Sequence, residues 1–272
     1  MSAIAQNIPA HEYHSLPGIS LTRLKLMEES YAAWLDNAPA GKEWGPLGEL
    51  VHTAVLEPDL LNVTVFPGRM DKRTKAYKEF AAEHEGETII NQGDWAIVDG
   101  IRASVARHPA AQEYLAKGQA ELSIFWKHPI GFDCRSRIDW LTDDVMMDLK
   151  SAQSVTPRRF GKQVADLYYY AQMAFYHDAA KALDGRDRKC VMLAAQKSAP
   201  YDVVPYRLPE EAVMAGRRLY QDWLLKLKKH QDNPELWRGI SDVEIELHLP
   251  EYVFSDMDDA RIVMPDGTEI AA

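Results

Sequence analysis

Two β-prone runs separated by a short turn constrain this chain more than any other feature. The runs are FDCRSRIDWL at 132–141 and VMMDLK at 145–150, and Thr142-Asp143-Asp144 lies between them. Strand-like runs flanking a short polar turn predict a β-hairpin. Because successive side chains of a strand point to opposite faces, Asp148 and Lys150 are expected to share one face of the second strand.

The same alternation orders the side chains of the first strand. It assigns Arg135, Arg137 and Asp139 to one face and Ile138 and Trp140 to the other. If the two strands pair around the turn, Asp139 is expected to lie beside the aspartate of the second strand.

Two neighbouring carboxylates repel each other, so this arrangement requires a cation between Asp139 and Asp148. A lysine beside that cation, Lys150, could orient or deprotonate a bound water or stabilise the charge that develops on a phosphate. Asp-x-Lys alone is common, and the preceding aspartate strengthens the interpretation. The residue types point to metal-assisted chemistry on a phosphate.

Segments of helical and strand-like character surround the hairpin. Helices are expected at 20–35, 47–56, 75–85, 94–107, 157–183 and 210–229, and further strands at 62–66, 120–127, 190–196 and 201–207. The predicted fold class is α/β, a central mixed or antiparallel sheet flanked by helices, with a helical N-terminal part. We expect an irregular lead-in at 1–17, one domain at 18–240 (helical part 18–117, mixed core 118–240) and a C-terminal extension at 241–272.

Composition narrows the functional classes. The net charge is −10, with 41 acidic and 31 basic residues, which argues against a protein that coats nucleic acid but leaves room for a local basic channel. The two cysteines, Cys134 and Cys190, cannot alone supply a four-thiolate site. No apolar run reaches the roughly 20 residues that span a bilayer, and the N-terminus lacks a secretion-signal pattern. A cytoplasmic protein without a membrane partner is expected.

Four residues outside the hairpin are further candidates. His52 follows Gly48 by four residues on a predicted helix, and an ordinary helix histidine is the alternative. Gln172 and Tyr176 are four residues apart on another predicted helix and therefore share a face, although an aromatic face packed into the core would look the same. Glu121 opens the first core strand, where an ordinary strand-edge glutamate is the alternative.

The ordered set Gly-x-x-x-His, Asp, Asp-x-Lys and Gln-x-x-x-Tyr resembles the RecB-like branch of the PD-(D/E)XK nucleases. GPLGELVHTAVLEP, ELSIFWKHPIGFDCRSRIDW, DLKSAQSVTPRRF and YYYAQMAFYHDA most resemble the RecE-type (exodeoxyribonuclease VIII-like) exonucleases. The resemblance covers about residues 18–230 and implies the PD-(D/E)XK core fold.

The resemblance implies a role for each candidate. His52, Asp139, Asp148 and the Leu149 carbonyl would bind Mg²⁺, or alternatively Mn²⁺, with Glu121 as a further candidate ligand, and Lys150 would be the catalytic lysine beside Asp148 and Asp139. DNA would be contacted by Gln172, Tyr176, Arg135, Arg137, Arg158 and Arg159. Two departures from the common pattern, Asp at 148 and Ile138 before Asp139, remove no ligand.

The activity implied is 5′→3′ digestion of linear double-stranded DNA to 5′-phosphomononucleotides, leaving 3′ single strands for recombination. A ring-shaped homo-oligomer, a single-strand annealing partner and a phage or prophage origin in a bacterial cytoplasm are also implied. An endonuclease, structure-specific or site-specific, on the same core remains an alternative, as does a non-catalytic DNA-end-binding adaptor. The cysteine count disfavours an iron–sulfur relative of the Cas4 kind.

Overall fold

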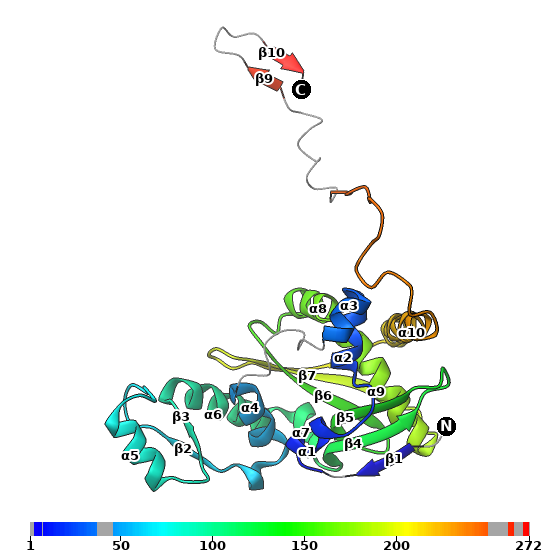
Figure 1. Ribbon diagram of the computed structural model, residues 1–272. Coiled ribbons are helices and arrows are strands. Elements are labelled where there is room, and N and C mark those ends of the chain that lie inside the picture. The colour runs from blue at the N-terminus through cyan, green and yellow to red at the C-terminus, as the bar shows by residue number, and fades with distance from the viewer. Residues whose placement is uncertain (1–2, 7, 37–45, 250–260, 264–268, 272) are drawn as a thin grey trace.

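The computed structural model describes residues 3–6, 8–36, 46–249, 261–263 and 269–271. A six-stranded sheet with the order β1-β4-β5-β6-β7-β8 forms its centre (Figure 1). Neighbouring strands are antiparallel except β6 and β7, which run parallel. The strands are β1 (Ala3–Gln6), β4 (Gln119–Lys127), β5 (Asp133–Leu141), β6 (Val145–Ala152), β7 (Lys189–Gln196) and β8 (Val203–Arg207). The α/β fold class expected from the sequence is confirmed.

Helices cover both faces of this sheet (Figure 1). On one side lie α2 (Leu21–Leu24), the 3₁₀ turn η1 (Lys25–Glu28), α3 (Tyr31–Asp36), α8 (Pro157–Asp166), α9 (Tyr169–Asp184) and α10 (Glu210–Asp232). On the other lie α4 (Pro46–Leu56), α6 (Gln92–Arg107) and α7 (Pro109–Leu115). A lobe beyond α6 holds η2 (Pro58–Leu60), β2 (Val63–Val65), α5 (Lys75–Glu83) and β3 (Thr88–Ile90), with β2 and β3 paired in parallel.

Strands β6 and β7 supply buried side chains to both layers, as expected for central strands. Met146 and Met192 pack into the core beneath α9 and α10, whereas Met147 and Leu193 pack into the core beneath α4 and α6. The polar side chains of Asp148 and Lys150 therefore point into the α9 layer, where both are buried.

Three segments differ from the sequence-based expectation. The lead-in at 1–17 contributes β1 and a short helix, α1 (Ala10–Ser15). The helix expected at 20–35 consists of α2, η1 and α3, and the Ser20 side chain caps α2. The helix expected at 157–183 is broken between α8 and α9, because Tyr168 adopts a left-handed backbone conformation with φ of +58°.

The C-terminal part leaves the compact body after α10. Residues 233–249 extend away from the sheet, and β9 (Arg261–Val263) pairs with β10 (Glu269–Ala271) in a separate hairpin (Figure 1). Among the described residues, no helix combines the length and the apolar character needed to span a membrane.

Candidate active site

Strands β5 and β6 pair only where their hairpin begins. Leu141 pairs with Met146 and Trp140 with Met147, and the ladder then stops. Beyond that point the backbone N–H of Leu149 donates to the side chain of Asp139, at 2.7 Å from Oδ2, instead of to a strand carbonyl. The strands therefore separate where the aspartate is inserted, which opens room for a site between two central strands.

Between β4 and β5, next to the same point, the paired side chains switch from one face of the sheet to the other. Leu122 pairs with Ile138 and both pack beneath α9, whereas the next pair, Ala120 and Trp140, packs on the α4 side. Glu121 lies between these pairs with φ of +51°, a left-handed conformation that costs a non-glycine residue about 1 kcal/mol. The prediction that Trp140 shares a face with Ile138 is wrong, because this local reversal interrupts the alternation.

The separation of the strands brings His52, Glu121 and Asp139 together. The Nδ1 atom of His52 lies 3.5 Å from a Glu121 oxygen and 3.6 Å from Asp139 Oδ2. Their ligating atoms all lie within 4.8 Å of one another, so this group of described residues could hold a metal ion. Imidazole with two carboxylates is a donor set that suits divalent first-row metals.

A contact on the far side of the imidazole fixes the orientation of His52. Its Nε2 lies 3.0 Å from the carbonyl oxygen of Leu149. If Nε2 donates its proton there, Nδ1 faces the carboxylates, the arrangement in which metal-binding histidines are commonly held. The Leu149 carbonyl, expected from the resemblance to bind metal, thus contacts His52 in this structure.

Asp148 and Lys150 are almost completely buried, with 1% and 2% of their surface exposed. Lys150 Nζ lies 2.6 Å from Asp148 Oδ2, and no other donor among the described residues reaches either Asp148 oxygen. A buried carboxylate with a single donor is under-satisfied, and a cation would complete its coordination. Asp148 does not belong to the group of His52, Glu121 and Asp139, but its negative charge raises the pKa of Asp139.

The electrostatics of the cluster show an excess of negative charge. Burial, together with the charge of Asp148, raises the pKa of Asp139 to about 7. Burial alone would lower the pKa of His52, but Asp139 and Glu121 outweigh it and raise that pKa. The cluster therefore holds protons that a divalent cation would displace, which is the behaviour of a metal site built from carboxylates.

The same carboxylates keep Lys150 charged. Burial would lower its pKa, but Asp148 and Asp139 outweigh burial and raise it. Its ammonium group also lies 4.6 Å from the ring centre of Tyr169, within the range of a cation–π contact. Tyr169 could not be predicted from the sequence, because a run of three tyrosines at 168–170 gives no periodic signal. Only the break between α8 and α9 places the second ring over the lysine.

Gln172 and Tyr176 project from α9 toward the same cluster. Their side chains hydrogen-bond to each other, and burial raises the pKa of Tyr176 well above its ordinary value, with Asp148 and Asp139 adding to the rise. The phenol thus lies in the field of the two aspartates and remains a proton donor. The structure therefore brings the Gln-x-x-x-Tyr residues into the neighbourhood of Asp-x-Lys.

The four arginines expected to contact DNA have different surroundings. Arg137 Nε lies 2.7 Å from Glu121 Oε2, so this side chain belongs to the edge of the cluster. Arg135 donates to the carbonyl oxygens of Tyr13 and Leu16 and holds α1 against the sheet. The remaining two, Arg158 and Arg159, are exposed at the start of α8.

Comparison with solved structures supports the fold. A crystal structure of a protein from Eubacterium rectale, described as a "putative exonuclease", superposes with a TM-score of 0.62 at 13% identity and covers 92% of this chain and 98% of that one. A second structure, of SSO0001, gives a TM-score of 0.29 at 14% identity over 67% of this chain and 88% of the other, which is too low to carry an argument. A comparison with curated proteins gave no match to this sequence.

A family of PD-(D/E)XK-like domains matches residues 20–237, which include every element of the candidate site. The six-stranded, mostly antiparallel sheet between helical layers agrees with that family's core. This chain therefore belongs to the family described as the PDDEXK-like domain of unknown function, DUF3799.

Proposed function

We propose that this protein is a metal-dependent 5′→3′ exonuclease of the RecE type that degrades linear double-stranded DNA. The observation that carries the proposal is the group of His52, Glu121, Asp139 and Asp148 beside Lys150, largely shielded from water at the point where β5 and β6 separate. The description of the structural neighbour as an exonuclease, and the family match, support the hydrolase class. Polarity and the 5′-phosphomononucleotide product rest on the motif resemblance.

The donor set fits a hard divalent cation such as Mg²⁺ or Mn²⁺, since three carboxylates provide oxygen ligands and one imidazole provides nitrogen. When bound, such an ion supplies Lewis-acid polarisation of the phosphate and lowers the pKa of a coordinated water. Asp139, Asp148, His52 and Glu121 would hold it, and the raised pKa of Asp139 makes its binding compete with a proton.

The remaining side chains act on the phosphodiester directly. Lys150, which the neighbouring carboxylates keep protonated, places a positive charge where the phosphorus group gains negative charge in the transition state. Tyr176 retains its proton and can donate it to a phosphate oxygen, held by its hydrogen bond with Gln172. Arg137 can pass from Glu121 to a phosphate once a cation neutralises the glutamate.

The wider biological role is part of the same proposal. A 5′→3′ exonuclease would leave 3′ single strands for an annealing protein during recombination, act as a homo-oligomeric ring around DNA and work in the bacterial cytoplasm on behalf of a phage or prophage. These features come from the resemblance to RecE-type enzymes.

One substrate comparison tests the activity. The protein is incubated with Mg²⁺ and equal amounts of linear duplex, covalently closed circular duplex, and linear duplex with 5′-phosphate or 5′-hydroxyl ends. We expect mononucleotides from linear DNA only, with a label at the 5′ end released first and a label at the 3′ end released last. Cutting of the closed circle would replace the exonuclease by an endonuclease on the same core, and binding of DNA ends without hydrolysis would favour the adaptor.

A further inference from the structure

A second lysine lies next to the catalytic lysine. Lys25, in the turn η1, is half-buried, and its pKa is lowered first by burial and then by the nearby charge of Lys150. Among the described residues, no carboxylate lies within ion-pairing distance of Lys25. Lys150 differs in this respect, since Asp148 contacts it at 2.6 Å.

The two lysines are held by consecutive tyrosines. Lys25 Nζ lies 5.8 Å from the ring centre of Tyr168, and Lys150 Nζ lies 4.6 Å from that of Tyr169. Tyr168 has the left-handed backbone conformation that breaks α8 from α9, and its ring packs edge-on against Trp223 of α10 at 5.6 Å. Strain at a non-glycine residue persists only where the surrounding packing enforces it, and such residues gather at functional sites.

The positive charge of Lys25 has no carboxylate partner among the described residues, and it lies near the positive charge of Lys150. A half-buried ammonium group loses part of its hydration, and a like charge nearby adds repulsion. A cation–π contact offsets only about 0.5–2 kcal/mol of such a cost. Most lysines avoid this by extending into water or pairing with a carboxylate, so the arrangement is stabilised when an anion enters between the two lysines.

We infer that Lys25 is a phosphate-binding residue, which together with Lys150 contacts the backbone phosphate of a nucleic acid at the active site. Tyr168 positions Lys25 and Tyr169 positions Lys150, so the junction between α8 and α9 sets the spacing of the two cations. The inference deepens the proposed function and rests on it for the identity of the ligand. It assigns a substrate contact to the N-terminal helical layer, 125 positions before Lys150 in the sequence.

The test is DNA binding without hydrolysis. Fluorescence anisotropy of a labelled duplex is measured in EDTA over a series of salt concentrations, for the wild type, Lys25→Gln, Lys25→Arg and the control Lys226→Gln. Lys226 is an exposed lysine of α10 that pairs with Asp222 of its own helix, so its loss removes a charge away from the site. Thermal melting of each variant accompanies the binding curves.

We expect Lys25→Gln to weaken binding about tenfold and to lower the slope of log K against log salt by about one, because one phosphate contact is lost. Lys25→Arg should keep most of the affinity, and Lys226→Gln should stay within about twofold of the wild type. Equal affinity and equal slope for Lys25→Gln and the control would overturn the inference, and so would a wild type that binds no duplex.

The outcomes separate the two proposals. A wild type that binds DNA but digests none in Mg²⁺ would defeat the proposed nuclease, while the salt slope of Lys25→Gln would still decide the role of Lys25. Efficient digestion by the wild type, together with an unchanged slope and an unchanged KM for Lys25→Gln, would defeat only the role of Lys25.

Discussion

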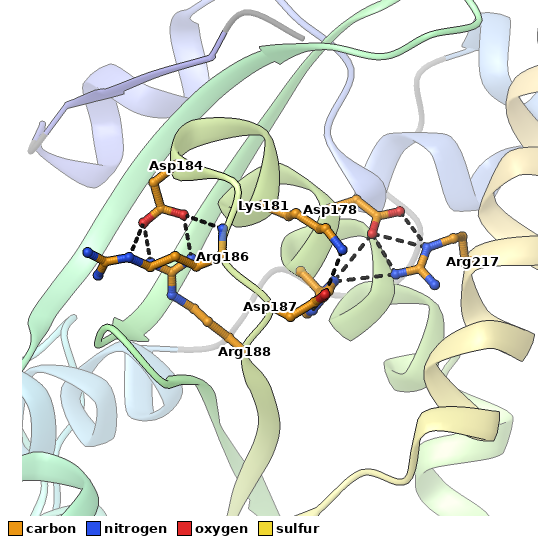
Figure 2. Close-up of polar contacts among 8 residues, drawn as sticks. Asp178, Lys181, Asp184, Arg186, Asp187, Arg188 and Arg217 are labelled. Atoms are coloured by element: carbon orange, nitrogen blue, oxygen red, sulfur yellow. Dashed lines mark hydrogen bonds and ion pairs between the residues drawn. The ribbon is translucent and has the colours of Figure 1, made fainter.

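Two carboxylates of this protein, Asp178 and Asp139, are held in opposite electrostatic states. Asp178, in the second half of α9, accepts hydrogen bonds from Arg217 at 2.6–3.1 Å (Figure 2). It also accepts one from Tyr220, and it contacts His177. Burial alone would raise its pKa, but these three partners outweigh it and lower the pKa to about 2. Asp139, on β5, has a pKa raised to about 7, chiefly by burial.

The difference lies in how many hydrogen bonds each carboxylate accepts and how deeply it is buried. Around Asp178 the salt bridges continue through Lys181 and Asp187 and nearby through Asp184 and Arg188, so most carboxylates there have a cation (Figure 2). At the β5–β6 separation, Asp139, Asp148 and Glu121 share Lys150, Arg137 and His52, and Lys150 is the only donor to Asp148 among the described residues. A balanced network joins two helices, whereas an unbalanced one is a candidate for binding a cation.

The largest effect is expected from Lys150→Met, which removes the charge and keeps most of the volume. Hydrolysis of linear duplex should fall at least about 1000-fold, because the transition state loses its nearest protein cation, while DNA binding is weakened much less. The measurement is single-turnover digestion. Lys181→Met in the α9–α10 network is the control and should keep its rate; equal rates for both variants would remove the functional distinction between the two groups.

A smaller effect is expected when the balanced network is broken. Arg217→Met leaves Asp178 buried without its main cation, which should lower the free energy of unfolding by about 3 kcal/mol. Urea unfolding measures this, with Lys228→Met as a control, since that lysine pairs only with exposed Asp232. An unchanged unfolding midpoint for Arg217→Met would show that the network is not structural.

The smallest effect is on folding stability, whose dependence on pH should have opposite signs for Asp139 and Asp178. The folded-state pKa of Asp139 is raised, so its protonated form contributes stability that is lost as pH rises through about 7. The folded-state pKa of Asp178 is lowered, so it contributes stability above its unfolded value of 3.8 that is lost as pH falls toward 2.

In EDTA at pH 8.5, Asp139→Asn should therefore stabilise the protein by at least about 1 kcal/mol, roughly 2–4 °C in Tm. The amide oxygen of asparagine can still accept the Leu149 N–H that Asp139 accepts. Asp178→Asn should destabilise at the same pH. Thermal melting of both variants at pH 5.5 and 8.5 checks the sign, and a lower Tm for Asp139→Asn at pH 8.5 would contradict the charge imbalance.

The sequence predicted the central part of the fold because its signals are local. The hairpin of β5 and β6 follows from alternation and a polar turn, and α4, α6 and α10 follow from apolar spacing. The proximity of Asp139 to Asp148 and Lys150 could also be predicted from local signals, since all three lie in one stretch of twelve residues.

What could not be predicted depends on tertiary packing. The left-handed conformations of Glu121 and Tyr168 occur at residues that carry no glycine or proline signal. Each one changes which side chains meet: the first reverses the facing of Trp140, and the second places tyrosine rings over two lysines. The contact of Arg135 with the carbonyl of Tyr13 likewise depends on β1 and α1, for which the short N-terminal sequence gave no periodic pattern.

The central claim is that the unbalanced carboxylates at the β5–β6 separation bind a divalent cation in competition with protons. Calorimetric titration of the wild-type protein with Mn²⁺, in two buffers of different ionisation enthalpy at pH 6, 7 and 8.5, measures both affinity and the number of protons released. The account predicts binding at one or two sites, with proton release that is largest at pH 6 and falls toward pH 8.5, and loss of that binding in Asp139→Asn but not in Asp178→Asn. Unchanged Mn²⁺ binding in Asp139→Asn, or no binding by the wild type, would contradict it.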